Sequence, residues 1–226
     1  MSLVLKIGGH LFHRDQLDHK FIRNVAETLR QTLRPEDKWV VVVGGGGGAR
    51  RFIDAARSLG ADETICDEIA IQVTRIHAML FIEALRDVAF PSVPRNTSEL
   101  REALIHSNLA VVGGFWPGQS TFAVASLCAQ AIKAPRMIVA TDVAGVYDSD
   151  PKGNPTARLI PRMTYSELWK LLAATSHRAG EYQLIDSVGL TMLERSRTKL
   201  LFIDGRDVEN IRRAILYNEA GTVVEP

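Results

Sequence analysis

The chain has 226 residues, and its 27 Lys and Arg against 26 Asp and Glu leave a formal net charge of +1. A chain of this length can bury a substantial core, as one large α/β domain or two closely joined lobes. The balanced charge gives no electrostatic reason to expect a nucleic acid or an anionic membrane as partner.

Cysteine usage and the apolar pattern favour a reducing compartment. Cys66 and Cys128 both lie in apolar helical patterns, without a CxxC motif, so we expect two reduced core thiols and no disulfide. Lys6 and a glycine pair interrupt the apolar start, which argues against a signal peptide, and no run of about 18 apolar residues occurs. We therefore predict a soluble, cytoplasmic protein.

Strand-like runs alternate with amphipathic helical patterns along the chain. This alternation predicts an α/β fold, a three-layer αβα sandwich with a mainly parallel central sheet. The predicted strands cover residues 3–7, 39–43, 109–112, 136–140, 199–203 and 222–224. The predicted helices cover residues 17–33, 49–59, 67–88, 98–106, 120–132, 164–173, 186–196 and 207–217.

A charged side chain interrupts the first predicted strand. Lys6 lies in an apolar run, two residues before the pair Gly8 and Gly9. Its ammonium group can reach past the strand end and neutralise phosphate oxygens. The alternative is a lysine whose charged head extends from an edge strand into water, and Lys6 alone does not separate the two.

The second predicted strand runs directly into five glycines. Residues 38–52 read KWVVVVGGGGGARRF, and the valines indicate a strand that is buried on both faces. Apolar side chains recur at helical spacing over residues 49–59, so we place the glycines between a strand end and a helix N-terminus. Free N–H groups and the helix dipole there favour an anion, to which Arg50 and Arg51 can add charge-assisted hydrogen bonds. The alternative is a flexible glycine-rich turn.

This glycine run matches neither common nucleotide-binding motif. A P-loop needs Lys and then Ser or Thr after its last glycine, where this chain has Ala49 and Arg50. A Rossmann fingerprint needs an acidic residue at the end of a second strand about 20 residues further on, and no clear one occurs. The glycines therefore indicate another arrangement for binding an anion.

Loops of small and polar residues follow four of the predicted strands. The loop GGFWPGQST follows the third strand and TDVAGVYDSDP follows the fourth. Ligands bind beyond the carboxyl ends of parallel strands, so we expect these four ends to converge on one edge of the sheet. Residues 148–163, with three prolines, are either a plain connection or a functional loop beside that edge. Asp186 occupies an expected helix N-cap position, where simple capping is the alternative to a functional role.

Seven segments, in order along nearly the whole chain, resemble the uridylate kinases of the amino acid kinase superfamily, most closely the archaeal type. The loop GGFWPGQST and the element GVYDSDP are the most specific parts of the resemblance. The segments are LKIGGHLF (5–12), VVVGGGGGARRFI (41–53), DEIAIQVTRIHAML (67–80), VVGGFWPGQSTFAVA (111–125), ATDVAGVYDSDPKGNPTA (140–157), LIDSVGLTMLERS (184–196) and GTVVEP (221–226).

The resemblance implies an ATP-dependent UMP kinase, which transfers the γ-phosphoryl group of ATP to UMP and gives UDP and ADP. Mg²⁺ would be carried by the ATP phosphates, without a metal site made of protein groups alone. These kinases usually form hexamers, so we expect a homo-oligomer. The apolar residues that could serve its interface, or the core instead, are Ile71, Ile76, Met79 and Phe81.

The resemblance also assigns the site residues, position by position. It gives catalytic roles to Lys6, Asp186 and Arg50, with Asp186 orienting Lys6. In a single domain over residues 1–226, residues 1–133 would mainly bind the acceptor and residues 134–226 mainly ATP. The residues implied for ATP are Lys6, Gly8, Gly9, His10, Gly46, Arg50, Thr141, Asp142, Tyr147 and Asp150. Those implied for UMP are Gly45, Asp67, Gly114, Phe115, Trp116, Pro117, Gly118, Gln119, Ser120 and Thr121.

Phosphoryl transfer also explains the residue types without the family. Its transition state is loose and highly charged, so catalysis needs positioning and charge compensation rather than a protein nucleophile. The attacking phosphate oxygen is already ionised at neutral pH, so no general base is required. Backbone N–H groups approach phosphates closely only where no Cβ intervenes, which glycine provides.

Five positions depart from the family pattern, one of which is Asp142 in place of the usual asparagine of the ATP loop. His10 follows the glycine pair where Ser or Lys is usual, and we favour a phosphate contact over simple capping. His77 replaces a common Asn and is interpreted as structural. Ala144 removes a carboxylate from the ATP loop, and Phe122 stands where a small or acidic residue is usual.

Two other functions are compatible with the sequence. One is a sister kinase of the superfamily that phosphorylates another small phosphate or carboxylate, although the loop GGFWPGQST favours the uridylate type. The other is a non-catalytic oxyanion store or nucleotide sensor. His10 and Ala144 would suit a binding protein, whereas Lys6 and Asp186 argue for catalysis.

Overall fold

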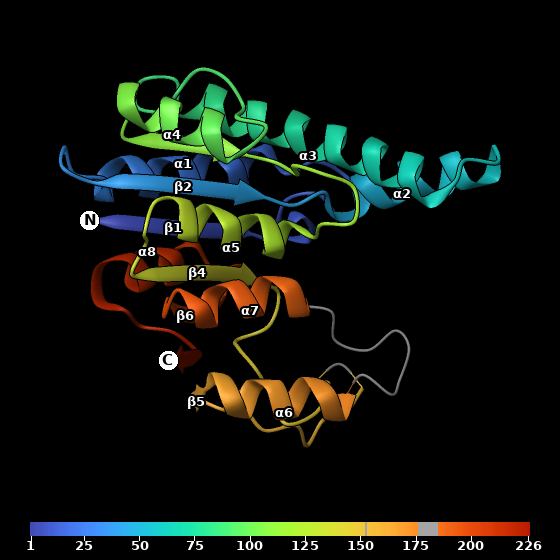
Figure 1. Ribbon diagram of the computed structural model, residues 1–226, viewed down its shortest axis with the longest axis vertical. Coiled ribbons are helices and arrows are strands. Elements are labelled where there is room, and N and C mark those ends of the chain that lie inside the picture. Colours follow the sequence, from blue (N-terminus) through green and yellow to red (C-terminus); the bar gives the residue numbers. More distant parts are fainter. Residues whose placement is uncertain (152, 176–184) are drawn as a thin grey trace.

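A seven-stranded sheet forms the centre of the molecule, in the order β3-β2-β1-β4-β6-β7-β5, with helices on both faces (Figure 1). The computed structural model describes residues 1–151, 153–175 and 185–226. The predicted α/β sandwich with a mainly parallel sheet is confirmed. The strands are β1 (Ser2–Ile7), β2 (Lys38–Val43), β3 (Leu109–Val112), β4 (Arg136–Thr141), β5 (Arg162–Thr164), β6 (Lys199–Asp204) and β7 (Thr222–Glu225). The helices are η1, a short 3-10 helix (Gly9–Leu11), α1 (His19–Thr32), α2 (Gly46–Ser58), α3 (Glu63–Ala84), α4 (Thr97–His106), α5 (Thr121–Ala131), α6 (Tyr165–Thr175), α7 (Ser187–Arg195) and α8 (Val208–Tyr217).

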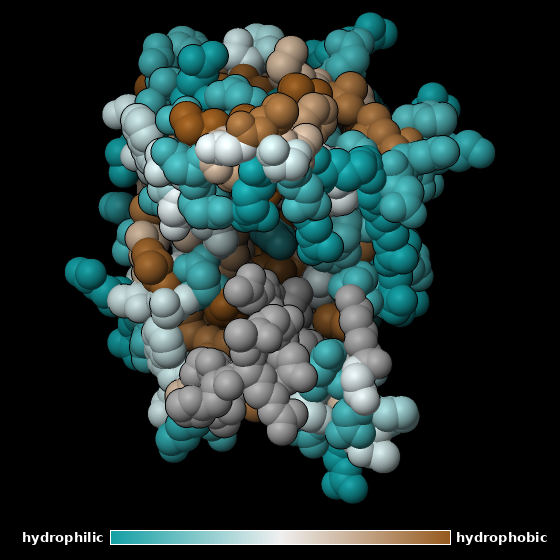
Figure 2. Space-filling view, turned by 90° about the vertical axis from the view of Figure 1, so that its right-hand side faces the viewer, coloured by the Kyte–Doolittle hydropathy of each residue, from teal (hydrophilic) through white to brown (hydrophobic). Residues whose placement is uncertain are grey.

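The carboxyl ends of the parallel strands meet at one edge of the sheet. β3, β2, β1, β4 and β6 run parallel, while β7 is antiparallel to β6 and parallel to β5. Ile7 at the end of β1 pairs with both Val43 and Ala140, and Val112 at the end of β3 pairs with Val42, so four strand ends lie side by side. The predicted convergence of the four strand ends is therefore confirmed. Figure 2 looks onto this edge, which is hollowed near its middle.

Apolar residues of the central strands fill two cores, one on each face of the sheet. Val40 and Val42 pack into the core beneath α5 and α7, whereas Val41 and Val43 pack into the core beneath α1 and α3. All four are at most 1% exposed. A strand that is covered on both faces needs no polar alternation, which is why the valine run is continuous.

The start of α2 differs from the sequence-based prediction. α2 begins at Gly46 instead of residue 49, so only Gly44 and Gly45 lie between β2 and the helix. The Gly47 amide donates to the carbonyl of His13 at 2.7 Å. Glycine is a poor helix former, so contacts with the segment between β1 and α1, rather than propensity, stabilise this first turn.

Other element boundaries also differ. α3 begins at Glu63, because the Asp62 side chain accepts a hydrogen bond from the Ile65 amide at 2.9 Å, and it ends before residue 85. The strand β5 was not predicted. It has three residues, of which one, Met163, is buried, so it is too short to produce an alternating pattern.

The segment 148–163 returns on itself beside β7, where the Val223 amide donates to the Pro161 carbonyl at 2.9 Å. Tyr147 forms an antiparallel bridge with Leu159, and the Ile160 amide donates to the Val146 carbonyl at 2.9 Å. Lys152, within this segment, lies outside the described residues. The two contacts of Tyr147 and Ile160 hold the ends of the segment together. Its role beside the ligand stays a prediction.

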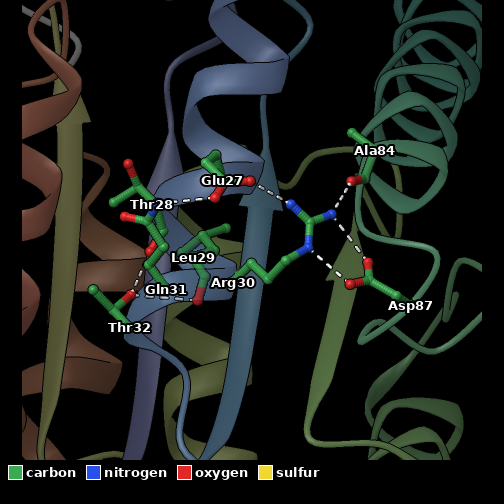
Figure 3. A network of polar contacts seen from close by, with 8 residues as sticks. All are labelled: Glu27, Thr28, Leu29, Arg30, Gln31, Thr32, Ala84 and Asp87. Carbon is green, nitrogen blue, oxygen red and sulfur yellow. Dashed lines mark hydrogen bonds and ion pairs between the residues drawn. The ribbon is translucent and has the colours of Figure 1, made fainter.

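One partly buried arginine joins α1 to the end of α3 (Figure 3). Arg30 donates to both carboxylate oxygens of Asp87, at 2.8 and 3.0 Å, and to the Ala84 carbonyl at 2.8 Å. Its remaining nitrogen donates to Glu27 at 2.8 Å. The carbonyl at the helix end gains a donor that the helix itself does not supply.

The two cysteines lie where they were predicted, whereas the apolar residues considered for an interface on α3 include both buried and exposed side chains. Cys66 and Cys128 are free and buried, as predicted. On α3, Phe81 belongs to the core, whereas Ile76 and Met79 are 56% and 61% exposed. Among the helices that the structure describes, none has the length and apolar character needed to cross a membrane.

Candidate active site

Two glycine turns are in direct backbone contact at the sheet edge. The Gly44 amide donates to the Ile7 carbonyl at 3.0 Å, and the Gly8 amide to the Ala140 carbonyl at 3.0 Å. A Cβ placed on Gly9 would lie 2.2 Å from the Gly46 nitrogen, so no side chain fits there. We call Gly8, Gly9, Gly44, Gly45 and Gly46 the glycine cradle. The predicted closeness of the two glycine turns is confirmed.

A buried ammonium group lies at the same edge. Lys6 is 9% exposed and lines a hollow of about 420 Å³. Burial removes water from the ammonium group and lowers the pKa of Lys6 from 10.5 to about 8, while the carboxylate of Asp142 acts in the opposite direction. The other residues of this hollow are Ser120, Thr121, Phe122, Ile185, Asp186 and Ser187.

Asp186 joins two helix N-termini beside Lys6. It is the N-cap of α7 and accepts a hydrogen bond from the Gly189 amide at 2.7 Å. Its other oxygen accepts from the hydroxyl of Ser120, which itself caps α5 through the Ala123 amide at 3.0 Å. Both helices thus direct their positive ends to the hollow that holds Lys6, which favours an anion.

A second hollow, of about 170 Å³, lies between α2, α3 and the loop after β3. Its apolar lining is interrupted by a few polar groups, as is typical of small-molecule pockets. Thr121 lines this hollow and the Lys6 hollow, so the two adjoin. The lining residues are Gly45, Gly46, Ala49, Asp67, Ala70, Ile71, Thr74, Gly114, Trp116, Gln119 and Thr121.

Hydrogen bonds from α3 hold the loop after β3. The Gly118 amide donates to the Asp67 carboxylate at 2.7 Å, with Gly118 at φ +76°, where glycine is favoured. The Gly114 amide donates to the Thr74 hydroxyl at 2.7 Å. Sequence reasoning missed Thr74, whose signal is a hydroxyl on the buried face of an apolar helix.

The residues predicted for UMP do not all line one hollow. Gly45, Asp67, Gly114, Trp116, Gln119 and Thr121 line the second hollow. Phe115 instead packs into the core at 3% exposure, and its carbonyl accepts a hydrogen bond from Arg75 at 3.3 Å. Ser120 lines the Lys6 hollow. Pro117 and Gly118 are absent from the walls of both hollows as the described residues form them.

A third hollow, of about 240 Å³, opens beside the ends of β4 and β6. Sequence reasoning missed its polar residues, although Asp204 ends a parallel strand and the same strand-end rule could have found it. The Asn210 side chain donates to the Asp204 carbonyl at 3.0 Å. The hollow is lined by Ala144, Ile203, Asp204, Asn210, Arg213, Glu219, Ala220 and Gly221.

Among the residues predicted for ATP, His10 and Asp142 form a pair. The His10 Nε2 and Asp142 Oδ1 atoms are 3.3 Å apart, so His10 contacts the carboxylate that also acts on Lys6. Thr141 is buried at the end of β4. Tyr147 and Asp150 follow in the segment that returns beside β7, where the Asn154 amide donates to the Asp150 carbonyl at 2.8 Å.

Arg50 has a different setting from the one predicted for a phosphate clamp. It is exposed on α2 and is absent from the walls of the three hollows, as far as the described residues form them. Its neighbour Arg51 instead bonds to the segment after η1, through the Arg14 carbonyl at 3.0 Å. The role of Arg50 therefore stays a prediction.

The fold and this edge define an α/β protein that brings backbone amides, a buried ammonium group and two helix N-termini to the place where phosphates would bind. The chain belongs to the amino acid kinase family, whose model matches residues 1–204. It is 42% identical to a uridylate kinase of Methanothermobacter thermautotrophicus, with 100% of both chains covered. It is 38% identical to a uridylate kinase of Hyperthermus butylicus, with 98% of this chain and 97% of the relative covered. The crystal structure of uridylate kinase from Archaeoglobus fulgidus superposes with a TM-score of 0.88 at 37% identity, covering 99% of this chain and 100% of that one.

Proposed function

We propose that this chain is an ATP-dependent UMP kinase, which transfers the γ-phosphoryl group of ATP to UMP and yields UDP and ADP. The observation that supports it most is the junction at Thr121 between a small-molecule pocket and a hollow that holds a buried ammonium group. The full-length similarity to uridylate kinases at 37–42% identity supports the same substrates.

UMP would bind in the second hollow, with its phosphate toward Thr121 and Lys6. The free lone pairs of Asp67 would accept from the ribose, while the loop after β3 encloses the nucleoside. Lys6 would then offset the charge that builds up between the two nucleotides, and the amides of the glycine cradle would orient the transferring group. No protein nucleophile is required, because the UMP phosphate itself attacks.

ATP would bind across β4 and β6. His10, Asp142 and Thr141 lie at the strand end next to Lys6, and we propose that Tyr147 and Asp150 contribute from the adjoining segment. The third hollow, beside the same two strand ends, is a candidate for the rest of the nucleotide. Residues 1–133 would then mainly bind the acceptor and residues 134–226 mainly ATP, within one domain.

The acidic residues fit a magnesium ion that arrives with ATP. Within the described residues, no group of three or more His, Cys, Asp or Glu side chains could hold a metal ion. Mg²⁺ keeps much of its water and binds nucleotide phosphates together with one or two carboxylates, and Asp142 and Asp204 would supply those. When bound, the ion would neutralise part of the phosphate charge.

We also propose that the chain assembles as a homo-oligomer, a hexamer, in the cytoplasm. Ile76 and Met79 on α3 are exposed apolar side chains that an interface would cover. Size measurement of the purified protein by light scattering tests the assembly.

An assay of ADP release tests the reaction. The protein is mixed with Mg-ATP and, separately, with UMP, CMP and a panel of small phosphates and carboxylic acids. We expect fast ADP release with UMP. Faster turnover of another acceptor would instead identify a sister kinase, and ATP or UMP binding without turnover would identify a sensor.

The pKa of Lys6 predicts an alkaline limit to activity. Because this pKa is lowered to about 8, the free enzyme loses the ammonium charge as the pH rises through that value, and kcat/KM for UMP should fall about tenfold for each further pH unit. The ammonium group is expected to act mainly on the transition state, so kcat should fall over nearly the same pH range. A kcat/KM that stays constant from pH 7 to pH 10 would contradict the role of Lys6.

The lowered pKa of Lys6 has the opposite effect on the stability of the fold, which should rise over the pH range in which activity falls. Between about pH 8 and 10.5 the unfolded chain still binds the proton that the folded chain has released. The contribution of Lys6 to the free energy of unfolding therefore rises with pH in this window.

A further inference from the structure

Two histidines link the glycine cradle to a surface arginine. His77 of α3 is 2% exposed, and its Nδ1 lies 2.9 Å from the Gly44 carbonyl oxygen. Its Nε2 lies 2.8 Å from the Nδ1 of His13. The Nε2 of His13 in turn lies 2.9 Å from an Nη atom of Arg51. These contacts form one unbranched chain from α2 through the β1–α1 segment and α3 to the end of β2.

The two ends of this chain fix the position of every proton in it. A carbonyl oxygen only accepts, so the Nδ1 of His77 must donate to Gly44, and its Nε2 then accepts from His13 if His77 is neutral. A guanidinium only donates, so the Nε2 of His13 must accept from Arg51. All three hydrogen bonds therefore form together in one state alone, with both imidazoles neutral and protonated at Nδ1.

The hydrogen-bonded chain of His77 and His13 contacts the backbone that forms the glycine cradle. Gly44 is the first residue of the glycine run, and the His77 bond fixes its carbonyl. The Gly47 amide donates to the His13 carbonyl, and a Cβ on Gly48 would lie 2.3 Å from the His13 ring. Edge contact with Phe12, at 5.1 Å between ring centroids, holds the plane of His77.

A further proton would break this chain. A protonated His13 would turn an N–H toward an N–H of Arg51, and a protonated His77 would turn one toward His13. The charged group that acts on His13 within the described residues is Arg51 of α2, which repels a second positive charge. The groups that act on His77 are the Gly44 carbonyl and His13. The guanidinium of Arg14 is turned back to the His10 carbonyl at 3.1 Å.

We propose that His13 and His77 are positioning residues, which hold the glycine cradle in its transfer-competent shape only while both imidazoles are neutral. The proposal rests on the proposed function, because it assigns the cradle to phosphoryl transfer. Turnover would then fall at acid pH because two side chains that contact neither nucleotide become protonated.

The direction of the pKa shifts agrees with this proposal. Burial, and for His13 also the charge of Arg51, lowers the pKa of both histidines below 6.5. The stability that the pair contributes is therefore complete above about pH 6.5 and is lost as the pH falls through the lowered values. We expect kcat to fall over that same pH range.

The first test measures kcat from pH 7.5 to 5 in the wild type, Arg51→Met and the control His19→Gln, an exposed histidine. Each variant is normalised to its own value at pH 7.5, and their ratios cancel the titration of UMP and ATP, whose phosphates ionise near pH 6. Between pH 7.5 and 5 we expect the normalised kcat of the wild type and of His19→Gln to fall about tenfold further than that of Arg51→Met. A factor of this size corresponds to the loss of one hydrogen bond. Without Arg51, a protonated His13 can donate to water and still donate to His77. Parallel profiles for all three proteins would overturn the proposal.

A second comparison separates positioning from packing. His77→Phe keeps a ring against Phe12 but removes both hydrogen bonds, and we expect kcat at pH 7.5 to fall about tenfold with little change in the KM for UMP. His77→Gln retains a donor and an acceptor and should recover most of this loss. Equal values for the two variants, or a loss confined to KM, would contradict a positioning role.

Nitrogen NMR of the histidine side chains tests the proton arrangement without substrates. We expect both rings at pH 7.5 as neutral Nδ1–H tautomers, and His13 in Arg51→Met to titrate at a higher pH than in the wild type. An Nε2–H tautomer in either ring would overturn the proposal even in an active kinase. If instead the tautomers are as expected but UMP is not phosphorylated, the proposed function fails and the proton arrangement stands.

Discussion

Replacing Lys6 with methionine is expected to lower kcat about a hundredfold or more, with the KM values for UMP and ATP changing by less than about threefold. Methionine keeps most of the side-chain volume in the buried site but removes the charge. The charge matters most when negative charge is concentrated between the two nucleotides, so its loss should raise the barrier more than it weakens binding. Steady-state kinetics with each nucleotide varied in turn measure the two effects.

Lys20→Met is the matched control, because Lys20 is exposed at the start of α1. It should leave both parameters within about twofold of the wild type, as surface substitutions usually do. Equal losses of kcat and nucleotide affinity in Lys6→Met would mean that the lysine only helps the substrates to bind. A Lys6→Met protein with normal turnover would remove the ammonium group from the mechanism.

Adding one methyl group to Gly9 is expected to abolish most of the activity. The new Cβ would lie 2.2 Å from the Gly46 nitrogen and 2.6 Å from the Gly44 carbonyl carbon. Both are backbone atoms, so the two turns must separate. We expect a loss of stability of about 1–3 kcal/mol, as for an overpacked core. We also expect at least about a hundredfold loss in kcat, because the cradle amides lose their orientation.

Gly153→Ala is the control for this substitution. Its Cβ would lie 3.7 Å from the nearest atom, an oxygen of Asp150, at ordinary contact distance. Urea denaturation and ADP release should therefore be close to those of the wild type. A Gly9→Ala protein with wild-type turnover would show that the close contact of the two turns is not needed for transfer.

Local patterns were sufficient for much of the fold. The continuous valine run identified a strand that is covered on both faces, and the alternation of strands and helices predicted the parallel sheet. The strand-end rule then indicated that residues as far apart as Lys6, Gly44 and Gly114 meet at one edge. The identities of the residues at that edge, read together, were specific enough to indicate the family.

Other features depended on contacts that no local pattern contains. The helical state of Gly46–Gly48 conflicts with the propensity of glycine and follows from packing against His13 and Arg14. Sequence reasoning expected Asp186 to orient Lys6. Both residues line one hollow, but the carboxylate that acts on the lysine charge is Asp142, which follows a neighbouring strand. β5 was missed because its pairing, rather than its sequence, makes it a strand.

The sequence by itself therefore determined the order of the elements, the burial of the central strands and the chemical groups available at their ends. The tertiary structure decided which of these groups touch one another, what burial does to the pKa of Lys6, and that His13 and His77 form a single chain to Gly44. The physical reason is the distance along the sequence over which each interaction acts. Periodicity and propensity act between residues a few positions apart, whereas hydrogen bonds and desolvation at this site join segments that are brought together only when the sheet forms.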